Sequence, residues 1–63
     1  MKKIINIVNL ENMDQVLVLK EHLRETRLTF EVSLEHKAVI IYGGPDEHRI
    51  AVHEIRKAGF EVL

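Results

Sequence analysis

Cysteine is absent from this chain of 63 residues. Without a thiol the protein cannot form a disulfide, bind a metal through thiolates or carry out cysteine-based redox chemistry. Tryptophan is also absent, and two phenylalanines and one tyrosine are the only aromatic residues. Because 46% of the residues are hydrophobic, the sequence predicts a globular core built mainly from aliphatic side chains.

Neither sign of charge is in excess, since nine Lys and Arg accompany ten Asp and Glu for a formal net charge of −1. A phosphate backbone binds best to a basic surface, so we expect no nucleic-acid partner. Base stacking on a sheet also requires exposed aromatic rings. The strand positions that we expect to face outward hold none.

Long hydrophobic runs are missing as well, because no segment approaches the ~20 apolar residues of a membrane span. Lys2 and Lys3 make the N-terminus basic, but the apolar run behind them is short and is interrupted by Asn6, unlike a signal peptide. We therefore expect a soluble, cytoplasmic protein with no membrane partner. Its length allows a single domain, residues 1–63.

The first half of the chain changes from a strand period to a helical one. Residues 3–8 are rich in β-branched side chains and predict a strand. Its two faces carry Ile5 and Ile7 on one side, and Ile4 and Val8 on the other. From Met13 to about Thr26 the spacing predicts a helix. One face of this helix carries Met13, Val16, Leu19, Lys20 and Leu23.

The second half predicts a hairpin, a helix and a last strand. Residues 29–34 alternate, with Phe30, Val32 and Leu34 facing inward, residues 35–37 form a polar turn, and residues 38–42 return as a strand. Pro45 opens the second helix and Gly59 ends it. Residues 60–63 are expected to form a short fourth strand.

The predicted order is therefore βαββαβ, which is typical of the α+β, ferredoxin-like arrangement. We expect one four-stranded antiparallel sheet with both helices on one face. The predicted core consists of Ile5, Ile7, Val16, Leu19, Leu23, Phe30, Val32, Ile40, Val52, Ile55 and Phe60.

Three stretches resemble one family: TFEVSLEHKAVIIY (residues 29–42), EIRKAGFEV (54–62) and the loop NLENMDQV (9–16). Together they resemble the heavy-metal-associated domain, the module of small copper chaperones and of copper-transporting ATPases. The resemblance covers essentially the whole chain, and KAGF is its most specific part. In that family the loop reads Gly-Met-x-Cys-x-x-Cys, and its two thiolates bind Cu(I) or another soft ion. Without a gap, the cysteine positions fall on Asn12 and Gln15.

Asn12 and Gln15 favour a helix cap over a metal site. Their amide oxygens are poor ligands for a soft ion, which selects thiolates and thioethers. Asn is a preferred N-cap, and a Gln three residues later completes a capping box. Asp14 adds negative charge where the helix dipole favours it. We therefore expect no metal at these positions and a helix cap formed by Asn12 and Gln15.

Other candidate ligands and catalytic groups are sparse. Met13 and Asp14 are weaker alternatives, because Met13 falls on the apolar stripe and is expected in the core. The four histidines are scattered, and His48 and His53 lie five residues apart rather than three or four. The only serine, Ser33, has no nearby base. We expect no catalytic residues, no enzymatic activity and no cofactor, the alternative being a weakly bound transition metal ion.

The outward face of the predicted sheet carries a patch of four aliphatic side chains: Ile4, Val8, Val39 and Ile41. Contiguous apolar patches often mark contact surfaces. The sequence therefore predicts a small interaction or regulatory module, a heavy-metal-associated-like domain without its thiolates. We expect its partner to be another protein or a second copy, bound through this outer face. The alternative function is a metal carrier related to copper chaperones that uses other ligands.

Overall fold

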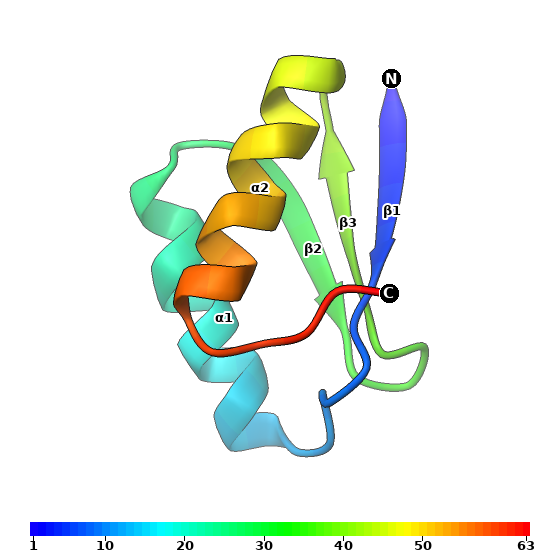
Figure 1. Ribbon diagram of the computed structural model, residues 1–63, viewed down its shortest axis with the longest axis vertical. Helices are drawn as coiled ribbons and strands as arrows, with labels where there is room; N and C mark the ends of the chain where they lie inside the picture. Colours follow the sequence, from blue (N-terminus) through cyan, green and yellow to red (C-terminus); the bar gives the residue numbers. More distant parts are fainter.

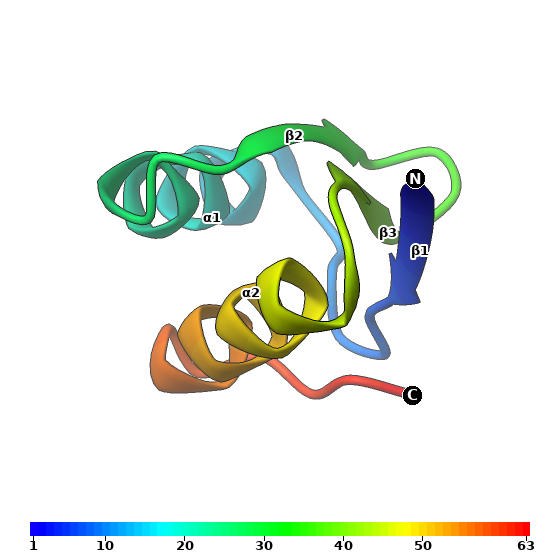
Figure 2. The same ribbon diagram turned by 90° about the horizontal axis from the view of Figure 1, so that it is seen from above.

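Two helices cover one face of a three-stranded antiparallel sheet in the computed structural model, which describes all 63 residues (Figures 1 and 2). Along the chain the elements are β1 (Lys2–Asn6), α1 (Met13–Glu25), β2 (Thr29–Ser33), β3 (Ala38–Tyr42) and α2 (Pro45–Lys57). The strands lie in the order β1-β3-β2. The predicted α+β class and both helices are therefore confirmed, whereas the fourth strand is not.

The segment after Gly59 forms a single bridge where the sequence predicted a strand over residues 60–63. Only Ile7 and Val62 pair, antiparallel, beyond the end of β1. Two backbone hydrogen bonds flank this bridge, from Val8 N to Glu61 O at 2.8 Å and from Leu63 N to Asn6 O at 2.9 Å. One bridge is too short to make a strand. The correct description is a three-stranded sheet with an adjoining C-terminal segment.

The ends of α2 follow local rules of helix termination. Glu47 accepts a hydrogen bond from the backbone N–H of the N-cap Gly44 at 2.6 Å. A Cβ at Gly43 would lie 2.6 Å from Cγ of Glu47, so this glycine makes room for the capping side chain. At the other end Gly59 has φ +96. Its N–H bonds to Arg56 O and that of Phe60 to Ile55 O, which is the Schellman arrangement.

The turn between β2 and β3 decides which face of β3 enters the core. It contains four residues, 34–37, instead of the predicted three, and it ends at Lys37 with φ +50. Ser33 therefore pairs with Ala38, and Val32 pairs with Val39. A shift of one residue in a turn exchanges the two faces of the following strand.

The prediction for the faces of β3 was consequently wrong. Val39 and Ile41 are fully buried, whereas Ile40, predicted to lie in the core, is partly exposed on the outer face. In β1 the prediction is confirmed, since Ile5 and Ile7 are buried and Ile4 is 57% exposed. β1 and β3 meet with Ile5 opposite Val39 and Ile4 opposite Ile40.

The core lies between the sheet and the two helices. Its buried members are Ile5, Ile7, Leu10, Val16, Leu19, Leu23, Val39, Ile41, Ala51, Ile55 and Phe60. Phe30, Val32 and Val52, which were also predicted, pack against this cluster but are only partly buried. Leu10 was not predicted. Met13 was expected on the buried stripe of α1, yet it is 57% exposed.

Candidate functional site

The loop before α1 is closed by a reciprocal pair of hydrogen bonds. The backbone N–H of Gln15 donates to Oδ1 of Asn12 at 2.9 Å, and the backbone N–H of Asn12 donates to Oε1 of Gln15 at 3.2 Å. The N–H of Glu11 also donates to the Gln15 oxygen. Both side chains that align with the cysteine pair of the resembled family are therefore engaged with backbone N–H groups, and they form the predicted capping box.

Asn9 and Leu10 anchor the same loop. Asn9 accepts a hydrogen bond from the backbone N–H of Glu61 at 2.9 Å, and its amide nitrogen lies 3.5 Å from Gly59 O. Leu10 is fully buried in the core. The loop is thus fixed from two sides, by the C-terminal segment and by the hydrophobic core.

The remaining candidate ligands do not converge. No group of three or more His, Asp or Glu side chains is arranged to hold a metal ion. Met13 and Asp14 are both exposed at the start of α1.

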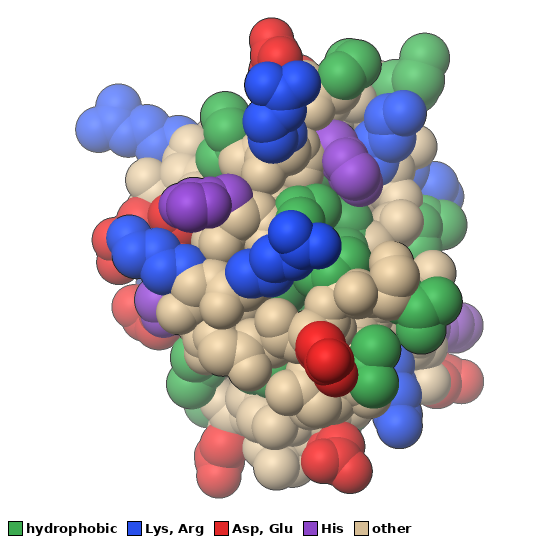
Figure 3. Space-filling model, in the orientation of Figure 1, with side chains coloured by type: hydrophobic (Ala, Val, Ile, Leu, Met, Phe, Trp, Pro, Cys, Tyr) green, Lys and Arg blue, Asp and Glu red, His purple; other side chains and the backbone are tan.

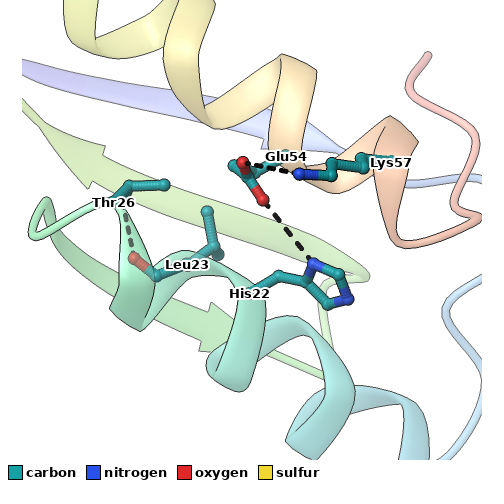
Figure 4. A network of polar contacts seen from close by, with 5 residues as sticks. All are labelled: His22, Leu23, Thr26, Glu54 and Lys57. Carbon is teal, nitrogen blue, oxygen red and sulfur yellow. Dashed lines mark hydrogen bonds and ion pairs between the residues drawn. The ribbon is translucent and has the colours of Figure 1, made fainter.

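A polar network connects the two helices across the side away from the sheet (Figure 4). Nδ1 of His22 on α1 lies 3.5 Å from the Glu54 carboxylate on α2, and Nζ of Lys57 lies 4.0 Å from the same carboxylate. Nearby, the Thr26 hydroxyl donates to Leu23 O at 2.5 Å and accepts from the N–H of Leu28 at 3.2 Å. Thr26 thereby bonds the last turn of α1 to the chain that leaves it. The contacts of His22 and Glu54 link the two helices.

The uncovered face of the sheet carries apolar side chains along β1 and β3. Ile4 and Ile40 are opposite each other on β1 and β3, and Glu31 of β2 is the next neighbour of Ile40. Val8 is 47% exposed and Tyr42 is 42% exposed. Of the predicted patch, Ile4 and Val8 are therefore accessible, whereas Val39 and Ile41 belong to the core. Ile40 and Tyr42, which the sequence did not predict, take their place on the outer face, and we call Ile4, Val8, Ile40 and Tyr42 the outer-face patch.

Tyr42 brings an aromatic ring to this face, where the sequence predicted none. Its hydroxyl donates to Oε2 of Glu31 at 2.8 Å. This hydrogen bond to a carboxylate is the main cause that raises the pKa of Tyr42 above its ordinary value of 10.0, with smaller contributions from desolvation and from the charge of Glu31. The ring is consequently held across β3 and β2.

The helical side of the molecule has a different surface. Figure 3 shows the molecule from the side of α2, with Lys, Arg, Asp, Glu and His side chains interspersed and apolar side chains visible in separate groups between them. Leu17, Val18 and Ile50 are its large exposed apolar residues within the helices besides Met13. The surface contains no pocket. Neither helix has the length and apolar character needed to cross a membrane.

Comparison with known proteins adds no relative to this picture, since no protein-family model, curated protein or solved structure matches the chain. The resemblance to heavy-metal-associated domains accordingly rests on the three sequence stretches alone. The two distinctive features of the molecule are the capped loop at one end of the sheet and the outer-face patch.

Proposed function

We propose that the protein is a small interaction module that binds a partner protein through the uncovered face of its sheet. The observation that carries this proposal is the pair Ile4 and Ile40, which lie opposite each other on β1 and the central strand β3. Ile4 leaves 57% of its surface in water even though the chain is only 63 residues long and has little apolar area to spare. Covering such a pair contributes about 25 cal/mol per Å² of apolar area removed from water.

The size of the face sets the strength and the kind of contact. Three strands of five residues, spaced ~4.8 Å apart with a rise of ~3.4 Å per residue, present roughly 250 Å² of flat surface. A stable interface takes about 800 Å² from each partner. The outer-face patch therefore supports a transient contact, in which the ring of Tyr42 and the two isoleucines supply the apolar centre.

The capped loop supports the same kind of function. In the proposal the chain is a heavy-metal-associated-like domain in which Asn12 and Gln15 stand at the thiolate positions. Each of these side chains accepts a hydrogen bond from a backbone N–H. The loop then acts as a helix start and not as a metal clamp, and the module acts by binding, in the cytoplasm, without a catalytic step.

Site-specific photo-cross-linking in the source cell tests the proposal. A photoreactive amino acid replaces Ile4 in one variant and Ile50, an exposed isoleucine on α2, in another. We expect a predominant protein adduct from position 4 that is missing from position 50. The partner is then identified by mass spectrometry and purified.

Binding of that purified partner decides the outcome. We expect Ile4→Glu to weaken it by about tenfold or more, as loss of a central apolar contact does. His53→Glu on α2 provides the control and should leave the affinity unchanged. Equal adducts from positions 4 and 50, or equal affinity of wild type and Ile4→Glu, would contradict the proposal.

A further inference from the structure

β2 is an open edge of the sheet, because β3 is its only neighbour. Such an edge offers unpaired backbone groups to another strand, and proteins usually protect it with Lys, Pro or a bulge. β2 has the sequence TFEVS, which contains no Lys, Pro or bulge and only one charged residue, Glu31. The opposite edge, β1, begins with Lys2 and Lys3 and is partly occupied by the C-terminal bridge.

The hydrogen-bond pattern identifies which groups point out of β2. The N–H of Ile7 donates to Lys37 O, so the odd-numbered residues of β3 face β1 and its even-numbered residues face β2. By the same alternation the odd-numbered residues of β2 face β3. The backbone N–H and C=O groups of Phe30 and Val32 therefore point to the open edge.

The side chains along this edge are apolar and incompletely covered. Phe30, Val32 and Leu34 pack against the core but remain partly exposed. These three residues alternate along the chain and lie on the side of the sheet that the helices cover. Val32 is the middle one of the three.

One flank of α1 continues this surface. His22 lies on the side of α1 that contacts Glu54 of α2. At 3.6 residues per turn, Met13 and Leu17 are about 180° and about 140° around the helix from His22, hence on the side away from α2. Since α1 packs under β2 and α2 under β3, that side of α1 adjoins the open edge of β2 (Figure 2). Met13 is 57% exposed and Leu17 is 56% exposed.

We infer that the edge of β2 and this flank of α1 are the interface of a homodimer. A twofold axis perpendicular to the sheet pairs β2 with β2 of a second copy, so that one six-stranded sheet forms with all four helices on the same side. Val32 then pairs with Val32 of the second copy, and Phe30 comes opposite Leu34 in the turn of the second copy. A self-complementary patch of this kind closes after two copies.

Charge favours this edge over the other one. With Val32 on the axis, Glu31 lies opposite Ser33 of the second copy and not opposite its own counterpart. On β1 the free part is shorter, because Asn6 O and Val8 N–H already bond to Leu63 and Glu61, and it carries two lysines on each chain, whose like charges oppose pairing of two copies. The two α1 helices run antiparallel in the β2 dimer, so the end that carries Asp14 lies beside the end of the second helix that carries Arg24.

The occupant is therefore a second copy and not an unrelated strand, because the backbone and apolar groups of this edge complement themselves about Val32. A 13-residue helix is about 20 Å long, which sets the length of the contact. We expect a total buried area near about 1,200 Å², the lower limit of stable interfaces, and a dissociation constant in the range of about 1–100 μM.

Sedimentation of the purified chain between about 1 μM and about 1 mM, which spans that range, is the first test. Over this range the wild type should change from a monomer to a dimer. Leu17→Glu should raise the dissociation constant by about tenfold or more, since it places a charge in the interface. Val18→Glu changes the next residue, which is similarly exposed but points toward another side of α1, and should leave the dimer intact. A wild type that stays monomeric at about 1 mM would overturn the inference.

Cross-linking in this cysteine-free chain tests the register. Antiparallel hydrogen-bonded partners have Cα atoms about 5.5 Å apart, which suits a disulfide. Val32→Cys, treated with a mild oxidant, should give a covalent dimer, whereas Ile4→Cys should not. A dimer that persists in Leu17→Glu and is lost in Ile4→Glu would place the contact on the outer-face patch and overturn the inference. The adducts at position 4 described above do not depend on either result.

Discussion

Asn12 and Gln15 each accept the other's backbone N–H, at 2.9 Å and 3.2 Å, at the start of α1. Asn12→Ala removes the acceptor for Gln15 N–H, so we expect a loss of about 0.5–2 kcal/mol in the free energy of unfolding. Gln15→Ala keeps the cap oxygen and should cost less. Denaturant unfolding followed by circular dichroism measures both. A larger loss in Gln15→Ala would contradict the dominance of Asn12.

Replacing both positions by cysteine tests the resemblance to heavy-metal-associated domains. We expect Asn12→Cys combined with Gln15→Cys to bind one soft metal ion per chain through two thiolates, because soft ions select such ligands. Native mass spectrometry with and without added Cu(I) under reducing conditions gives the stoichiometry. Each single variant serves as a control and should bind far more weakly. No gain of binding in the double variant would remove the support for the alignment of this loop.

The neighbouring residues Ile40 and Ile41 should respond very differently to the same substitution. Ile41→Glu places an unpaired charge in the core, which we expect to cost at least about 3 kcal/mol and to unfold much of the population. Ile40→Glu lies on the outer face and should change the free energy of unfolding by less than about 1 kcal/mol. Thermal unfolding of the two variants side by side provides the measurement. The reverse order would mean that the faces of β3 are exchanged.

Arg27 and Gly59 both have a left-handed backbone conformation, so introducing glycine at one and removing it from the other should have opposite effects on stability. Arg27 has φ 63, a region that disfavours side chains with a Cβ, so Arg27→Gly should stabilise the fold by about 0.5–1 kcal/mol. Gly59 has φ +96 and no atom within 4 Å of an added Cβ. Gly59→Ala should therefore destabilise by about 1 kcal/mol or more through backbone strain alone. Chemical denaturation of both variants decides the matter; destabilisation by Arg27→Gly would speak against a strained backbone there.

Tyr42 is the only tyrosine, so its ionisation can be followed by ultraviolet absorbance. Its pKa is raised above 10.0, chiefly by the hydrogen bond to Glu31. The contribution of this hydrogen bond to the free energy of unfolding is fully present below pH 10. It is lost as the pH rises through the raised pKa of Tyr42 in the folded protein. We expect Glu31→Gln to lower the midpoint of titration toward 10.0. An unchanged midpoint would show that the carboxylate does not hold the ring.

The sequence predicted β1, both helices and the cap of α1 because each carries its own local signal. Ile5 and Ile7 alternate with polar or exposed neighbours, and Asn12 stands three residues before Gln15. The faces of β3 could not be predicted in this way. AVIIY is apolar at four successive positions, so alternation does not distinguish Ile40 from Ile41.

Which face of β3 enters the core depends on the length of the turn before it, and the sequence indicates that length only weakly. Leu34 is apolar and reads as the end of a strand, yet it belongs to the turn, and Lys37 takes a left-handed conformation without being glycine. Tyr42 lies on the outer face because of the same register, so the sequence did not predict its position there either. The fourth strand failed for a related reason, since residues 60–63 have strand-like composition but pair with the chain only at Ile7 and Val62.

The hydrogen bond between Asn9 and Glu61 has a consequence for the order of folding. It joins residues 52 positions apart, almost the full length of the chain. Closing a loop of that size costs about 3–4 kcal/mol of chain entropy. Contacts between residues that are close in the sequence close shorter loops, so they cost less chain entropy. The hairpin of β2 and β3 can form first, and the last segment docks only when β1 and α2 are already in place. The N–H of Glu61 should accordingly exchange with solvent deuterium faster than the amides of β3, because the chain opens at this junction before it unfolds as a whole.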